Sequence, residues 1–131
     1  MRIIFLSFIL FLSVTTSNGQ NIDSTDLFRM AKAMNAACPF SKGPNIRMDS
    51  ARAIMPDTLL NFLTIIESKD AQKGIEQLRQ SKTSFMQGLA KDRRMKYLMS
   101  QHIVLGYDFF YHKNRIISWV IGPEQFKKYA N

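Results

Sequence analysis

The sequence predicts an α+β domain: a four-stranded antiparallel sheet with helices packed on one face, in the order helix-strand-strand-helix-strand-strand. The first observation is a hairpin near the C-terminus. Large apolar side chains recur at every second position over residues 103–112, and the pattern repeats over residues 116–121 after a turn at Lys113-Asn114. The second observation is a similar unit upstream, in which a helical periodicity precedes two extended runs. Two such units can close into one sheet.

The first helix is expected to begin near Ser24. Asp23 or Ser24 can accept hydrogen bonds from the first turn, and Asp26 lies where the helix dipole favours a carboxylate. Apolar residues then recur at helical spacing, at Leu27, Met30, Met34 and Ala37 or Cys38. Pro39 ends the helix because the residue before a proline avoids helical angles.

The first hairpin follows a turn over residues 41–45. A strand is expected from Ile46, with Ile46, Met48 and Ser50 facing the same way, and Pro56-Asp57 marks a tight connection. Residues 58–66 are apolar on both faces, which is typical of a central strand.

A long helical stretch follows, and its apolar positions are Ile75, Leu78, Phe85 and Leu89. Lys82 occupies one expected apolar position, and Gly88 predicts a bend or break. A shorter helix is expected through Met95 and Leu98. After the second hairpin, Phe126 and Tyr129 are expected to pack a terminal turn back onto the body.

Residues 1–19 have the pattern of a signal peptide, and residues 20–131 form a single α+β domain. Arg2 precedes an apolar run, Ile3 to Val14, and Ser17-Asn18-Gly19 places small residues at a cleavage site. The alternative is a retained anchor, but the run is shorter than the ~20 residues that span a bilayer. We therefore expect an exported protein, either periplasmic or secreted.

The net charge limits the classes of binding partner, and the cysteine content limits the disulfides that the chain can form. The net charge of +8 is compatible with an anionic surface, an acidic protein or nucleic acid, and equally with ordinary solubility. Export makes nucleic acid an unexpected partner. The single cysteine, Cys38, cannot form an internal disulfide, so it is a packed residue, an intermolecular bridge or a reactive thiol.

The second face of the predicted sheet is too apolar to be left in water. Its expected lining is Leu59, Leu63, Ile65, Phe110, Ile116 and Val120. A second subunit, a ligand or the terminal segment should therefore cover it.

Two segments and the closing hairpin carry a resemblance to a known group of proteins. Asn35-Ala36-Ala37-Cys38-Pro39, then Ile46-Arg47-Met48-Asp49, and the closing Tyr107-x-Phe109-x-Tyr111 hairpin resemble small uncharacterised exported bacterial α+β proteins. The chain departs from that pattern by lacking a second cysteine after the long helix and a glycine where Gln101-His102 stands. The resemblance implies an exported α+β domain and brings no established activity.

Candidate catalytic and metal sites are sparse. Cys38 could pair with His102 or His112, but it lies at a helix C-terminus, where the dipole disfavours a thiolate. The two histidines, ten residues apart along one strand, would be separated by roughly 33 Å. We therefore assign no catalytic residue, no metal and no cofactor, and the absence of phosphate-loop, nucleophile-elbow and zincin motifs argues against a familiar enzyme.

The candidate binding residues fall in two places. Asp108 and Phe110 would stand on the second sheet face, where Asp108 is either the main polar group of a pocket or a solvated strand residue. Arg93, Arg94 and Lys96 belong to a dense basic run that could meet phosphates, lipid head groups or an acidic protein, or form a solvated helix face.

Three functional hypotheses follow. The first is a small exported binding domain, of the class that includes inhibitors and immunity proteins, whose second sheet face meets a protein partner or a second copy of the chain. The second is an enzyme of unrecognised type, with Asp108, His102 and Tyr107 around a pocket on the sheet. The third is attachment to an anionic envelope membrane through Arg93, Arg94 and Lys96.

Overall fold

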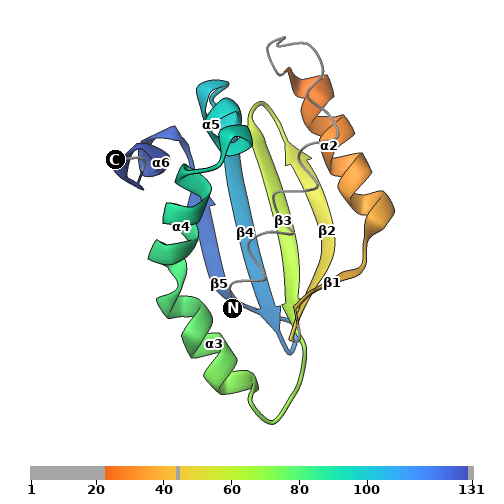
Figure 1. Cartoon of the computed structure of the whole chain (residues 1–131). Coiled ribbons are helices and arrows are strands. Elements are labelled where there is room, and N and C mark those ends of the chain that lie inside the picture. Colours follow the sequence, from red (N-terminus) through yellow and green to blue (C-terminus); the bar gives the residue numbers. More distant parts are fainter. Residues whose placement is uncertain (1–22, 44, 130–131) are drawn as a thin grey trace.

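The computed structural model describes residues 23–43 and 45–129 (Figure 1). Its elements, in chain order, are α2 (Ser24–Ala37), β1 (Phe40–Gly43), β2 (Ile46–Ile54), β3 (Thr58–Ile65), α3 (Ala71–Gln80), α4 (Lys82–Ala90), α5 (Arg93–Ser100), β4 (Val104–Tyr111), β5 (Asn114–Ile121) and α6 (Pro123–Tyr129). The predicted signal peptide lies outside the described residues. Within the described ranges, no helix is both long and apolar enough to cross a membrane.

The α+β class is confirmed, but the sheet is five-stranded and mixed. Its strand order is β1-β2-β3-β4-β5, and β3 and β4 run parallel, with Leu59 opposite Leu105 and Leu63 opposite Phe109. The prediction of four antiparallel strands was therefore wrong. Helices α3, α4 and α5 carry the chain from the end of β3 back to the start of β4, and a parallel pair requires such a long crossover.

The additional strand, β1, occupies part of the segment predicted to be a turn. It pairs antiparallel with the beginning of β2, with Phe40 opposite Met48 and Ser41 opposite Arg47. Phe40 packs against the core. This packing of Phe40, three positions before Gly43, extends the sheet beyond the predicted edge.

A bulge in β2 changes which of its residues face the core. The register shifts between Met48 and Ser50, so that Ser50 lies opposite Phe62 and Ala51 opposite Asn61. Ala51 is buried with Ile46 and Met48. The prediction that Ser50 shares their face was wrong, because the extra residue of a bulge reverses the alternation after it.

The break expected near Gly88 lies at Lys91-Asp92, between α4 and α5, and the long helix has a further, unpredicted break at Ser81. Helix α3 ends at Gln80, α4 begins at Lys82, and the Ser81 hydroxyl donates to the Leu78 carbonyl at 2.7 Å. The break restarts the helical phase, so Lys82 is exposed while Phe85 and Leu89 remain buried. Gly88 lies inside α4.

Helix α2 begins as predicted and is fixed to the sheet at its other end. Asp23 and Asp26 form a capping box, each side chain accepting from the other's backbone N–H at 3.0 Å. Near the C-terminus, the Asn35 amide donates to the Ala51 carbonyl at 2.8 Å and its oxygen accepts from the Ala51 N–H at 2.7 Å. Asn35 thus satisfies both backbone groups of Ala51 on β2.

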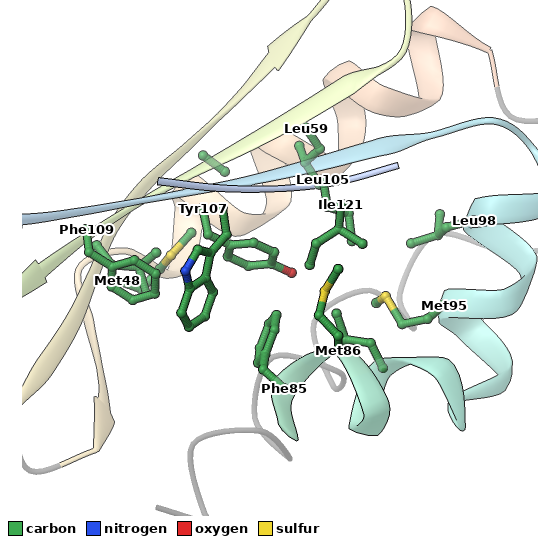
Figure 2. Close-up of a cluster of buried hydrophobic side chains, with 14 of the residues drawn as sticks. Met48, Leu59, Phe85, Met86, Met95, Leu98, Leu105, Tyr107, Phe109 and Ile121 are labelled. Carbon is green, nitrogen blue, oxygen red and sulfur yellow. The ribbon is translucent and has the colours of Figure 1, made fainter. Parts of the chain in front are cut away.

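All five helices of the described ranges pack on one face of the sheet, around one hydrophobic core. Figure 2 shows Tyr107 and Phe109 pointing from the sheet toward the helix side, where Phe85 and Met86 of α4 lie beside Met95 of α5. The Phe85 ring meets Tyr107 edge-on with centroids 5.3 Å apart. Burial raises the pKa of the Tyr107 hydroxyl well above its ordinary value.

Candidate functional site

The face of the sheet opposite the helices is the candidate site, and we call it the open face. Its lining alternates with the buried strand positions and consists of Arg47, Asp49, Ser50, Arg52, Ile54, Leu60, Phe62, Thr64, Val104, Gly106, Asp108, Phe110, Arg115, Ser118 and Val120. The opposite face of the same strands holds the core described above.

The structure corrects part of the predicted lining of this face. Leu59, Leu63 and Ile65 are buried against the helices. Ile116, next to a bulge in β5, also packs against the core. Phe110 and Val120 do lie on the open face, joined by Leu60 and Phe62 of β3. The alternation was predicted correctly, but the parity of β3 was assigned the wrong way round.

The centre of the open face is apolar. The Phe62 and Phe110 rings lie on neighbouring strands with centroids 6.2 Å apart. Beside them the Leu60 side chain covers Gly106, where a Cβ atom would lie 2.7 Å from Leu60 Cδ1. Gly106 therefore lets Leu60 lie flat across β4 and extend the apolar surface toward Val120, which is 56% exposed.

Asp108 lies within this surface, and its charge is already balanced by neighbouring groups. It is 6% exposed. The Ser118 hydroxyl donates to Asp108 Oδ1 at 2.7 Å, and Arg115 Nη1 is 3.8 Å from Oδ2. These contacts fix the carboxylate between β4 and β5. Asp108 is therefore a structural anchor for Arg115 rather than an unpaired acid.

Asp49 is held in a similar way at another position on the open face. Arg47 Nε lies 2.6 Å from Asp49 Oδ1, and the Thr64 hydroxyl donates to Oδ2. The bulge in β2 places Asp49 so that its carboxylate meets Thr64 on β3. Both carboxylates of the open face are thus engaged by groups of the same face.

Three arginines lie around the apolar centre. Arg52 is on β2 and Arg115 on β5, on opposite sides of the two central strands, and Arg47 lies at the end of β2 near Thr64. The side chains of Arg47 and Arg115 are 47% and 61% exposed in spite of their ion pairs. Arg52 is exposed and forms no ion pair within the described part of the chain. The face therefore offers apolar contact and arginine donors together.

The residues of the enzyme hypothesis do not come together. Tyr107 points into the core, whereas Asp108, the next residue on β4, points to the open face. His102 is exposed in the turn before β4, with a φ of 61°. These three side chains share no concavity.

The histidine pairing is also separated. Cys38 caps the C-terminal end of α2, as predicted, and is half-buried. His102 and His112 lie at opposite ends of β4. Among the described residues, no three His, Cys, Asp or Glu side chains are grouped so as to hold a metal ion.

One polar cluster was not predicted. The Tyr111 hydroxyl donates to both Glu67 oxygens at 2.9 Å, and His112 Nε2 contacts the same carboxylate. The hydrogen bond to Glu67 raises the pKa of Tyr111, and desolvation and the Glu67 charge add to this. The hairpin turn consists of His112 and Lys113, both with positive φ, rather than the predicted Lys113-Asn114. This turn brings His112 to Glu67, which is distant in sequence.

The predicted basic residues lie away from the strands, on α5. Arg93 and Lys96 are exposed, and Arg94 Nε lies 3.6 Å from Asp92, the N-cap of the helix. The structure therefore divides the predicted binding residues between two surfaces, with Asp108 and Phe110 on the open face and the three cations on α5.

Comparison with known proteins supports the fold and assigns no function. No protein-family model matches the sequence, and no curated protein matches it. Among solved structures, the chain is similar to the crystal structure of a predicted secreted protein from Pseudomonas aeruginosa, with a TM-score of 0.64 and 14% sequence identity over 79% of this chain and 91% of that chain. At this identity the similarity shows the fold alone. It agrees with the resemblance to exported bacterial α+β proteins in fold and bacterial source, and it does not test the individual motifs.

Proposed function

We propose that the protein is a small exported interaction domain. Its open face binds an acidic, partly apolar surface of another protein. The observation that carries the proposal is the ring of arginines, Arg47, Arg52 and Arg115, around the apolar centre formed by Leu60, Phe62, Phe110 and Val120. Export is supported by the predicted signal peptide and by the similarity to a predicted secreted protein.

The composition of the open face matches that of protein interfaces. Aromatic residues and arginine are enriched in such interfaces, whereas lysine is depleted, and the charged strand residues that face outward here with a positive charge are all arginines. The two carboxylates are engaged by groups of the same face, so a partner need not neutralise them. What the face lacks is an acceptor for Arg52 and for the unused donors of Arg47 and Arg115, and an acidic partner supplies one.

A second copy of the chain fits this surface less well. Two identical faces related by a twofold axis would bring like-charged arginines toward one another, and like charges at an interface disfavour association. We therefore propose a different protein as the occupant. An inhibitor or immunity role belongs to this class of function.

A photo-cross-linking experiment tests the proposal in the exporting cell. A photoreactive phenylalanine analogue replaces Val120 on the open face or, as a matched control, Phe28 on α2, which is 61% exposed. We expect the Val120 position to capture a heterologous protein that the Phe28 position does not. Adducts only with the protein itself, or the same adducts from both positions, would refute the proposal.

The captured protein must then bind in purified form through charge. We expect Arg52→Glu to weaken its affinity on the order of tenfold, and a compensating acidic-to-lysine change in the partner to restore it. The control is Arg29→Glu on α2, an equal change in net charge at an exposed site away from the open face. Equal losses from both variants would show attraction by net charge alone and would contradict the assigned surface.

A further inference from the structure

A second charged surface lies at the end of the molecule formed by α5 and α6. Helix α6 packs against α4 and α5, so the helix that carries Lys127 and Lys128 adjoins the helix that carries the basic run (Figure 1). We call this surface the basic end and define it as Lys91, Arg93, Arg94, Lys96, Lys127 and Lys128. The sequence separates its two parts by the whole second hairpin, so the fold creates the cluster.

Few acidic groups offset these cations. Asp92 accepts from the backbone N–H groups of Arg94 and Met95 and lies 3.6 Å from Arg94 Nε, so it is committed to capping α5. Glu124 Oε1 lies 3.9 Å from Lys127 Nζ. Among the described residues, these six cations and two carboxylates sum to four positive charges. Exposed Lys91, Arg93, Lys96 and Lys128 form no ion pair within the described ranges.

The surroundings of the cations distinguish between partner classes. The large exposed apolar side chains of residues 23–43 and 45–129 are Phe28, Ile54, Met55, Ile66 and Val120, and none of these lies on α4, α5 or α6. A protein interface with an apolar core therefore has no basis at this end. Tyr97 and Tyr129 are half-buried rather than free to stack on bases, as single-stranded nucleic acid requires. Lipid head groups need only charge.

We infer that the basic end binds the anionic head groups of a phospholipid bilayer. The attraction is electrostatic and acts within about 10 Å of the surface at 0.1 M ionic strength. Each lysine or arginine near such a surface strengthens binding by about fivefold. The inference concerns a surface other than the open face and does not depend on the proposed function.

The test measures sedimentation of the processed protein with vesicles of mixed phosphatidylglycerol and phosphatidylcholine, and with vesicles of phosphatidylcholine alone. The patch variant carries Arg93→Gln, Lys96→Gln, Lys127→Gln and Lys128→Gln. The matched control carries Arg29→Gln, Lys32→Gln, Lys69→Gln and Lys73→Gln, which removes the same charge from exposed sites on and before other helices.

We expect binding to the phosphatidylglycerol vesicles that is lost at about 1 M salt, where the screening length falls to about 3 Å. The patch variant should bind at least 100-fold more weakly than the wild type, since four contributions of about fivefold each are removed, and the control should lose much less. Equal losses in the two variants, equal binding to phosphatidylcholine, or no salt-sensitive binding by the wild type would each overturn the inference. Circular dichroism melting confirms that the variants are folded, and the wild-type salt series tests the inference without any variant.

Discussion

Asn35 is an exposed residue whose replacement should destabilise the fold. Its side chain forms two hydrogen bonds with Ala51, donating to the carbonyl at 2.8 Å and accepting from the N–H at 2.7 Å. Strand β1 pairs only with the beginning of β2, so Ala51 lies on a stretch of β2 that has no strand on its outer side. Asn35 takes the place of that missing strand and fixes the end of α2 to the sheet edge.

The magnitude follows from these two bonds. Each contributes about 0.5–1.5 kcal/mol net, and Ala gains at most about 0.7 kcal/mol over Asn in helix propensity. Asn35→Ala should therefore lower the free energy of unfolding by about 1–2 kcal/mol. Asn35→Asp should cost at least as much, because the carboxylate keeps the acceptor for the Ala51 N–H but faces the Ala51 carbonyl without a donor.

Urea unfolding followed by circular dichroism measures the effect as a shift in midpoint at unchanged m-value. The control is Lys32→Ala, another exposed change on α2, which should stay within about 0.5 kcal/mol of the wild type. If Asn35→Ala and Lys32→Ala have the same unfolding midpoint, the claim that Asn35 secures the edge of β2 is refuted.

Three further predictions concern the open face, the core and the hairpin turn. Gly106→Ala should displace the end of the Leu60 side chain, because its Cβ would lie 2.7 Å from Leu60 Cδ1, and should lower the free energy of unfolding by no more than about 1 kcal/mol, since that side chain can shift toward solvent. Gly88→Ala, with nothing within 4 Å of its Cβ, should raise it by up to about 1 kcal/mol; thermal melts that show a larger loss for Gly106→Ala, or a loss for Gly88→Ala, would contradict the packing. Leu105→Ala in the core should cost about 2–5 kcal/mol in urea, against less than about 0.5 kcal/mol for Val120→Ala on the open face. The raised pKa of Tyr111 means that this group stabilises the fold below its unfolded pKa of 10.0, and that the contribution is lost as the pH rises through the folded value. Absorbance titration, taken as the difference from Tyr111→Phe, should show a midpoint above 10.0 that falls in Glu67→Gln, and an unchanged midpoint in that variant would exclude the Glu67 contact as the cause.

The class of the fold was predictable because side-chain periodicity reports it directly. The alternation around Tyr107 and Trp119 identified the last hairpin, and the polar cap at Asp23 identified the start of α2. These signals depend only on neighbouring residues, so they can be interpreted without knowledge of the rest of the chain.

The strand directions were not predictable in this way. Periodicity shows that residues 58–65 and 104–111 are strands, but whether they pair parallel or antiparallel depends on the path of α3, α4 and α5 between them. The face of β3 was likewise ambiguous, because Leu59 and Leu60 are both apolar and only burial against the helices distinguishes them. The β2 bulge then reversed the assignment of Ser50.

In the candidate surfaces, too, local patterns were predictable and contacts between distant elements were not. Phe110 and Asp108 were placed on the second face by simple alternation, and the basic run of α5 by composition. Arg52, Arg115 and the lysines of α6 were not identified, because their significance lies in which distant elements they adjoin. The Glu67 contact with His112 depends on the turn conformation in the same way.

Sedimentation of the processed protein over a concentration series, with and without reductant, measures whether the open face pairs with itself. We expect a monomer throughout, because the open face is suited to an acidic partner and its arginines oppose a symmetric pair. A dimer that persists in reductant and dissociates on Val120→Asp would show that the open face binds a second copy of the chain, and would contradict a different, acidic protein as its partner.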